Sequence, residues 1–180
     1  RDSHAAAYYD WGTEKETQWK ENYRLWMAFV NEYKNRGGRV TAGADSGYMY
    51  NLYGFGYIQE LELLREAGFH PMEVIQSATL NAAEAIGMDD QIGTIEVGKL
   101  ADMILMDQNP LKNLKYLYGT GDIKLNETNE VVRVGGVNYT IKDGIIYDAR
   151  QLLEDVKKIV DEEKEATPNW ERLMIQSIDR

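Results

Sequence analysis

Thr41-Ala42-Gly43-Ala44-Asp45-Ser46-Gly47 connects a short predicted strand, residues 39–43, to a tight turn. Before it runs a helical pattern, residues 16–34, which ends at Gly37-Gly38 because glycine accepts the left-handed backbone of a helix exit. Another helical pattern follows the turn. The order helix, strand, turn and helix predicts a parallel α/β sheet or barrel.

Asp45 is the strongest candidate for a catalytic residue. It lies just past the carboxyl end of the predicted strand, between Gly43 and Gly47. In parallel α/β folds, catalytic side chains gather at this edge. A carboxylate there can accept a proton from a nucleophilic water or bind a metal ion. The alternative is structural, because Asp often caps a turn through its own backbone.

The first 88 residues are predicted to be mostly helical. One helix carries Ile58, Leu61 and Leu64, another begins at Pro71, and the Asn81/Glu84 spacing predicts a capping box for a third. Apolar residues recur at three- and four-residue steps within residues 16–34 and are expected in the core: Trp19, Tyr23, Trp26, Met27, Val30 and Tyr33.

Beyond Gly87 the pattern changes to short strands, with residues 119–130 expected to form a polar loop. Asp143-Gly144 is a strong hairpin signal, and a final helix is predicted at residues 150–163. The chain therefore divides into residues 1–88, 89–149 and 150–180. The predicted strands are residues 92–95, 103–106, 131–134, 137–141 and 145–147.

Aromatic residues crowd the segment after Asp45, and Tyr48 and Tyr53 are candidates for substrate contact. Such residues can line a pocket or pack the segment onto its scaffold. A nucleophile mechanism is disfavoured, because Ser46 lacks a G-x-S-x-G elbow and the chain has no Cys. The two His, His4 and His70, form no recognisable zinc site, and His70 before Pro71 suits a helix cap or the surface.

The charge balance argues against a nucleic-acid partner. The chain has 20 Lys+Arg against 30 Asp+Glu and a formal net charge of −10, and each of its three parts is net negative. No apolar run of about 18 residues predicts a membrane span. Without Cys the compartment stays open, and no apolar signal-peptide core opens the sequence.

The ordered segments resemble the C-terminal portion of a metal-dependent amidohydrolase, in the imidazolonepropionase-like branch. The resemblance covers roughly residues 17–150, and each motif alone is modest whereas their order is specific. The matching stretches are Thr41-Ala42-Gly43-Ala44-Asp45-Ser46-Gly47, Glu66-Ala67-Gly68-Phe69-His70-Pro71-Met72-Glu73-Val74-Ile75, Ser77-Ala78-Thr79-Leu80-Asn81-Ala82-Ala83, Ile92-Gly93-Thr94-Ile95-Glu96-Val97-Gly98-Lys99-Leu100-Ala101-Asp102, Asn109-Pro110 and Lys142-Asp143-Gly144.

The resemblance implies that residues 39–43 are the eighth strand of a (β/α)8 TIM barrel and that the later strands belong to a flanking composite β-sandwich. Asp45 would be the aspartate that contacts the metal, directly or through a neighbour. It would take a proton from the attacking water and pass it to the leaving nitrogen. Asp102 would serve folding. The implied cofactor is a divalent metal, zinc, as one or two ions.

The chain departs from the family where the metal ligands belong. Amidohydrolases take them from a His-x-His pair on the first barrel strand and from later strands that this chain lacks, and a complete barrel needs ~250 residues. The sequence therefore predicts a fragment that is inactive alone and needs the other barrel half, in the same chain or another. The expected activity is C–N bond hydrolysis of a small amide or related substrate. A prolidase-like peptidase and a non-catalytic structural module remain alternatives, and a homo-oligomer stays open.

Overall fold

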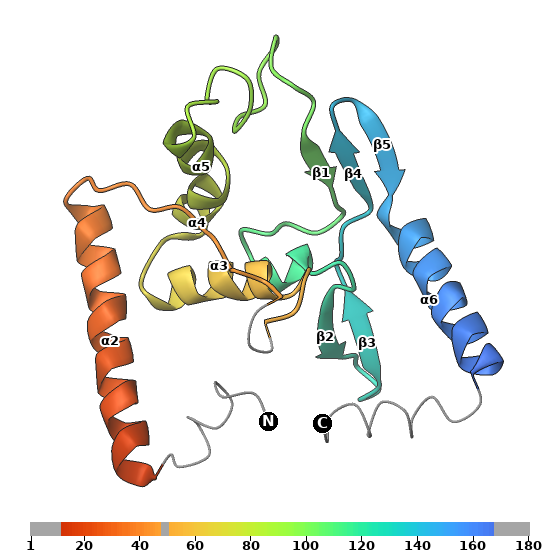
Figure 1. The fold of residues 1–180 in the computed structure, drawn as a ribbon, viewed down its shortest axis with the longest axis horizontal. Helices are drawn as coiled ribbons and strands as arrows, with labels where there is room; N and C mark the ends of the chain where they lie inside the picture. Colours follow the sequence, from red (N-terminus) through yellow and green to blue (C-terminus); the bar gives the residue numbers. More distant parts are fainter. Residues whose placement is uncertain (1–11, 48–50, 168–180) are drawn as a thin grey trace.

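The computed structural model describes residues 12–47 and 51–167. Helices come first and strands later, as predicted, and α2 and α6 run along opposite edges of the molecule (Figure 1). The predicted helices at residues 16–34, at Ile58–Leu64, from Pro71 and at 150–163 are confirmed. The elements are α2 (Thr13–Asn35), α3 (Gly56–Glu66), α4 (Pro71–Ala78), α5 (Leu80–Ala85), β1 (Met103–Leu105), η1 (Leu114–Leu117), β2 (Asp122–Leu125), β3 (Val131–Val134), β4 (Tyr139–Lys142), β5 (Ile145–Asp148) and α6 (Ala149–Ala166).

The core lies where α3 and α4 meet the short 3-10 helix η1. Phe69, in the connection between α3 and α4, is 1% exposed, and the Lys34 ammonium lies 4.9 Å from the centroid of its ring. This cluster joins the helical part of the chain to the segment that precedes β2. Its buried members are Leu61, Leu64, Ala67, Phe69, Val74, Leu114 and Leu117.

Phe69→Ala is expected to lower the free energy of unfolding by about 3–5 kcal/mol, because it removes a buried ring and leaves a cavity in a packed core. Phe29→Ala is the matched control, since Phe29 is 59% exposed. Urea unfolding of the 180-residue chain measures both. Equal losses in the two variants would show that this cluster is not the core.

The three-stranded antiparallel sheet has β4 in the middle, between β1 and β5. Asp143 and Gly144 connect β4 to β5 with φ values of 49° and 77°, the left-handed values that a type I′ turn needs, so the predicted hairpin is confirmed. The Asp102 carboxylate accepts hydrogen bonds from the Lys142 ammonium and, at 2.7 Å, from the Asp143 N–H. These bonds, the Lys142 one first, lower the pKa of Asp102. Asp102 thus ties β1 to the hairpin, which fits a folding role.

Two predictions in the strand region are wrong. Residues 119–130 are not all loop, because Asp122–Leu125 form β2 and pair antiparallel with β3. Residues 92–94 form bends and residue 95 is irregular, so no strand forms there. There the Ile92 N–H donates to the Met88 carbonyl at 2.9 Å, and Gly93 has φ 92°, with no room for a Cβ beside Ala83.

The predicted strand at residues 39–43 is not a strand in the described part of the chain. The Ala42 N–H donates to the Ser77 carbonyl at 3.2 Å, and the Val40 carbonyl accepts from Asn81 Nδ2 at 2.9 Å. A strand requires a neighbouring strand for its ladder. The described elements beside this segment are helices, so its backbone bonds to α4 and α5 instead.

The capping box predicted at Asn81 and Glu84 is also wrong. Thr79 precedes α5, Asn81 binds Val40, and the Glu84 carboxylate pairs with the Arg39 guanidinium at 3.0 Å. Both side chains therefore hold the extended segment rather than the start of their own helix.

The apolar stripe of α2 was expected in the core, and the structure confirms this only for Met27 and Val30, which are partly buried against the core cluster. Of the other predicted members, Trp19 is 56% exposed, Trp26 65% and Tyr33 48%. Phe29, which was not part of the predicted stripe, is 59% exposed on the same helix. Tyr23 donates its hydroxyl to the Glu66 carboxylate at 2.8 Å; burial and then this bond raise its pKa to about 12. The helical period was interpreted correctly, but the described chain provides too little surface to cover this face.

The final helix α6 is capped by Asp148, whose carboxylate accepts from the N–H groups of Arg150 and Gln151 at 3.0 Å.

Among residues 12–47 and 51–167, no helix combines the length and apolar character that crossing a bilayer requires.

Candidate active site

Asp45 sits at the far end of the extended segment that leaves α2. Its side chain is exposed, and among the described residues its carboxylate has no hydrogen-bond or ion-pair partner. Its φ is 45°, the left-handed conformation, which non-glycine residues seldom adopt. Within the described chain, the carboxylate therefore does not cap its own turn. It is available to a substrate, a water or an ion.

Asn51 binds the backbone on both sides of Asp45. Its side-chain Nδ2 donates to the carbonyl of Ala44, and its backbone carbonyl accepts from the Gly47 N–H at 2.6 Å. No sequence signal points to Asn51. Its position between a tyrosine-rich segment and a helix start carries no recognisable motif, so only the folded geometry identifies it.

Tyr53 lies against Gly47, two residues after Asp45. Its hydroxyl rests against the Cα of Gly47, where an added Cβ would overlap it. The side chain is 78% exposed, and the hydroxyl has no partner among the described residues. Tyr48, the other predicted substrate contact, lies outside the described residues.

The neighbouring aromatic residues pack onto the scaffold instead. The Phe55 ring lies 5.7 Å from the Tyr118 ring, centroid to centroid, and the Tyr57 hydroxyl donates to the Ala78 carbonyl at 3.3 Å. Of these aromatic side chains, Tyr53 is the one whose hydroxyl reaches the Asp45 turn.

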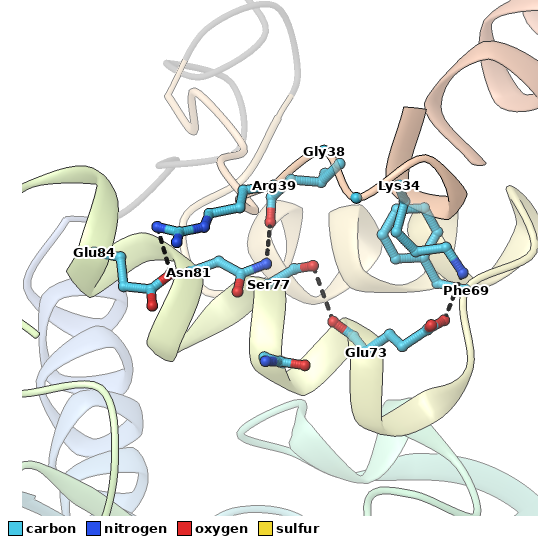
Figure 2. A pocket seen from close by; sticks show the side chains of 11 residues that line it. Lys34, Gly38, Arg39, Phe69, Glu73, Ser77, Asn81 and Glu84 are labelled. Carbon is cyan, nitrogen blue, oxygen red and sulfur yellow. Dashed lines mark hydrogen bonds and ion pairs between the residues drawn. The ribbon is translucent and has the colours of Figure 1, made fainter. Parts of the chain in front are cut away.

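A pocket of about 360 Å³ opens at the other end of the extended segment, between α2 and α4 (Figure 2). Arg39 points to Glu84 on one side, and Lys34 pairs with Glu73 at 2.7 Å on the other. Its lining includes residues 37–40 but none of 41–47. The pocket is therefore separate from the Asp45 site, and its four charged side chains are all paired.

Glu73 also explains the position of His70 at the start of α4. The Glu73 carboxylate accepts from the Lys34 ammonium and, at 2.7 Å, from the His70 N–H; these bonds lower its pKa. His70 is exposed at the residue before α4, and Pro71 occupies the first helical position. The helix-start role predicted for His70 is confirmed.

The donor set at Asp45 fits one oxygen ligand of a divalent cation and no more. No group of three or more His, Cys, Asp or Glu side chains among the described residues could hold a metal ion. This part of the chain can therefore contribute a carboxylate to a metal site but cannot form one.

Comparison with known proteins gives the family of the chain. The amidohydrolase family matches residues 26–146. An imidazolonepropionase from Geobacillus sp. (strain WCH70) is 40% identical over 79 residues, which are 44% of this chain and 17% of the relative. A 5'-deoxyadenosine deaminase from Methanobrevibacter smithii is 30% identical over 121 residues, which are 61% of this chain and 26% of the relative.

Solved structures give the same class. A putative prolidase from Bifidobacterium longum superposes with a TM-score of 0.55 and 26% identity, over 72% of this chain and 30% of that one. A Xaa-Pro dipeptidase with methionine in its active site superposes with a TM-score of 0.51 and 26% identity, over 68% of this chain and 25% of that one.

These matches define a hydrolase class whose fold is the TIM barrel. This chain belongs to the amidohydrolase family. It spans 25% and 30% of these two solved structures and 17% and 26% of the two curated relatives.

Proposed function

We propose that this chain supplies the catalytic carboxylate, Asp45, to a hydrolase that cleaves C–N bonds with an activated water. The observation that carries the proposal is the exposed carboxylate of Asp45, without a partner among the described residues and held on a left-handed backbone. Asp45 accepts the proton of the attacking water and returns it to the leaving nitrogen. Membership of the amidohydrolase family supports this chemistry.

The proposed cofactor is zinc, as one or two ions, and Asp45 contacts it directly or through a neighbouring group. A divalent ion, when bound, polarises the water and the scissile group near neutral pH. Because the described residues offer one ligand, the remaining ligands come from other parts of the enzyme.

The exposed face of α2 is proposed to pack against the rest of the enzyme. Residues 1–88 are proposed to complete a (β/α)8 barrel with the rest of the enzyme, which covers Trp26 and Phe29 and gives residues 39–43 their neighbouring strands. Residues 89–149 form part of a composite β-sandwich, and residues 150–180 are a C-terminal helix and tail. The exposed fractions of Trp26 and Phe29 support this arrangement.

We propose two candidate substrate classes, each supported by one group of relatives. A cyclic amide of the imidazolone type is favoured by the 40% identity to an imidazolonepropionase. The second candidate is an Xaa-Pro dipeptide, favoured by the likeness to two prolidase-type structures.

The direct test assays the intact enzyme with an imidazolone lactam, an Xaa-Pro dipeptide and a purine nucleoside carrying an exocyclic amine. Turnover of the lactam, with slower or no turnover of the other two, is the expected result. Turnover of the dipeptide alone would indicate a prolidase, and turnover of the nucleoside would indicate a deaminase. If no C–N bond is cleaved, the chain is a non-catalytic module.

Tyr53→Phe is expected to lower kcat/KM by about 2–10-fold, because it removes one hydrogen bond worth about 0.5–1.5 kcal/mol to a bound substrate. Steady-state kinetics on the preferred substrate measure the change. Tyr147→Phe is the matched control, since Tyr147 lies on β5 and is 42% exposed. Identical kcat/KM values for both variants and the parent enzyme would remove Tyr53 from the substrate site.

A further inference from the structure

Asn51 attaches both flanks of Asp45 to a single residue. The Ala44 carbonyl, immediately before Asp45, accepts from the side-chain Nδ2 of Asn51. The Gly47 N–H, two residues after Asp45, donates to the backbone carbonyl of Asn51 at 2.6 Å. The backbone of Asp45 is therefore tethered on both sides.

The left-handed backbone of Asp45 explains why a tether is needed at this position. The left-handed backbone costs an L-residue about 1–2 kcal/mol, somewhat less for Asp, and such residues persist where surrounding structure holds them. Asp45 adopts φ 45°, and its carboxylate has no partner among the described residues. The restraint therefore acts on the backbone, and within the described chain Asn51 provides it.

The Asn51 side chain is itself packed against the start of α3. A Cβ at Gly56 would overlap Asn51 Oδ1 and lie 2.8 Å from Ser46 Oγ, so the Asn51 amide occupies the space that glycine leaves open. Gly56 is buried and is the first residue of α3, which also contributes Leu61 to the core. Asn51 thus connects the rigid end of a core helix to the Asp45 turn.

The amide oxygen of Asn51, Oδ1, is in an unfavourable environment. Asn51 Oδ1 is buried and has no hydrogen-bond partner among the described residues. An unpaired buried acceptor is unfavourable by about 1–3 kcal/mol. A residue selected only for stability would not leave this acceptor unpaired. The hydrogen bond from Nδ2 to the Ala44 carbonyl is therefore the feature that Asn51 provides.

We propose that Asn51 is a positioning residue that sets the direction of the Asp45 carboxylate by fixing the backbone on both sides of it. The proposal rests on the proposed function, since it requires Asp45 to carry the proton. Asn51 touches neither the substrate nor the ion in this role, and all of its effect passes through Asp45.

The experiment measures kcat, KM and bound metal of the intact enzyme with Asn51→Ala and with the isosteric Asn51→Asp, which lacks the Nδ2 donor. Each variant should lower kcat by about 10–100-fold, with KM and metal content unchanged, because a misplacement of about 1 Å costs that much. Asn126→Asp is the matched control and should keep full turnover, since Asn126 Nδ2 donates to Glu130 in the turn between β2 and β3.

Double variants separate this proposal from the proposed function. In an Asp45→Asn background, Asn51→Ala should cause no further loss of kcat, because groups that act as a unit are not additive. A full additional 10–100-fold loss there would overturn the positioning role, as would unchanged kcat in both single variants while Asp45→Asn is inactive. If Asp45→Asn itself keeps full turnover, the proposed function fails first.

Discussion

Asp45→Asn in the intact enzyme is expected to lower kcat by about 10³-fold while the fold stays in place. The amide of Asn has the same shape as the carboxylate but cannot accept the proton that general base catalysis requires, and such groups contribute about 10²–10⁴-fold. Because Asp45 is exposed and makes no described side-chain contact, the substitution should not change the midpoint of thermal unfolding. Steady-state kinetics and thermal unfolding measure the two quantities.

Asp143→Asn is the matched control for this substitution. Asp143 is also exposed and also has a positive φ, 49°, but it lies in the turn between β4 and β5. Full turnover is expected in this variant. Equal kcat in the Asp45 and Asp143 variants would exclude Asp45 from the reaction.

Removal of divalent metal is expected to reduce turnover of the intact enzyme by about 10³-fold or more, because without the ion the pKa of the attacking water is no longer lowered toward neutrality. Dialysis against a chelator, followed by metal analysis and kinetics, gives the measurement. Metal removal is expected to leave the unfolding midpoint of the core around Phe69 unchanged, because no described core residue is a metal ligand.

Adding back zinc should restore turnover, and Ca²⁺ should not, because calcium prefers six to eight oxygen ligands. Unaltered turnover in a preparation with less than about one tenth of an ion per chain would contradict a metal-dependent reaction.

The helices could be predicted from sequence because their signals are local. Pro71 at the first helical position, Gly68 after α3 and the apolar spacing of residues 16–34 each act within a few residues. The same holds for Asp143-Gly144, whose left-handed backbone makes the turn between β4 and β5.

Predictions that depended on distant partners were wrong. Residues 39–43 have strand-like composition, but their hydrogen bonds go to Ser77 and Asn81 because no described strand lies beside them. The α2 stripe has helical spacing, but spacing cannot say what covers it, and Trp26 is 65% exposed. In β2, the charges of Asp122 and Lys124 hid an alternating strand pattern.

The candidate site was predicted in part. Asp45 was found from its place between two glycines, and the structure shows its carboxylate without a partner in the described chain. Asn51 was missed because its role depends on the carbonyl of Ala44 and the missing Cβ of Gly56, which only the fold brings together. The metal ligands that the resemblance implies cannot be located in the described residues.

A crystal structure of the intact enzyme with its metal, located by anomalous scattering, tests the central claim most directly. The predicted result is an Asp45 carboxylate oxygen about 2.0–2.2 Å from a zinc ion, or within hydrogen-bonding distance of a water beside that ion. The completed barrel should also cover Trp26 and Phe29. A metal site whose ligands and waters all lie more than about 6 Å from the Asp45 carboxylate, beyond the reach of a direct charge interaction, would contradict the account.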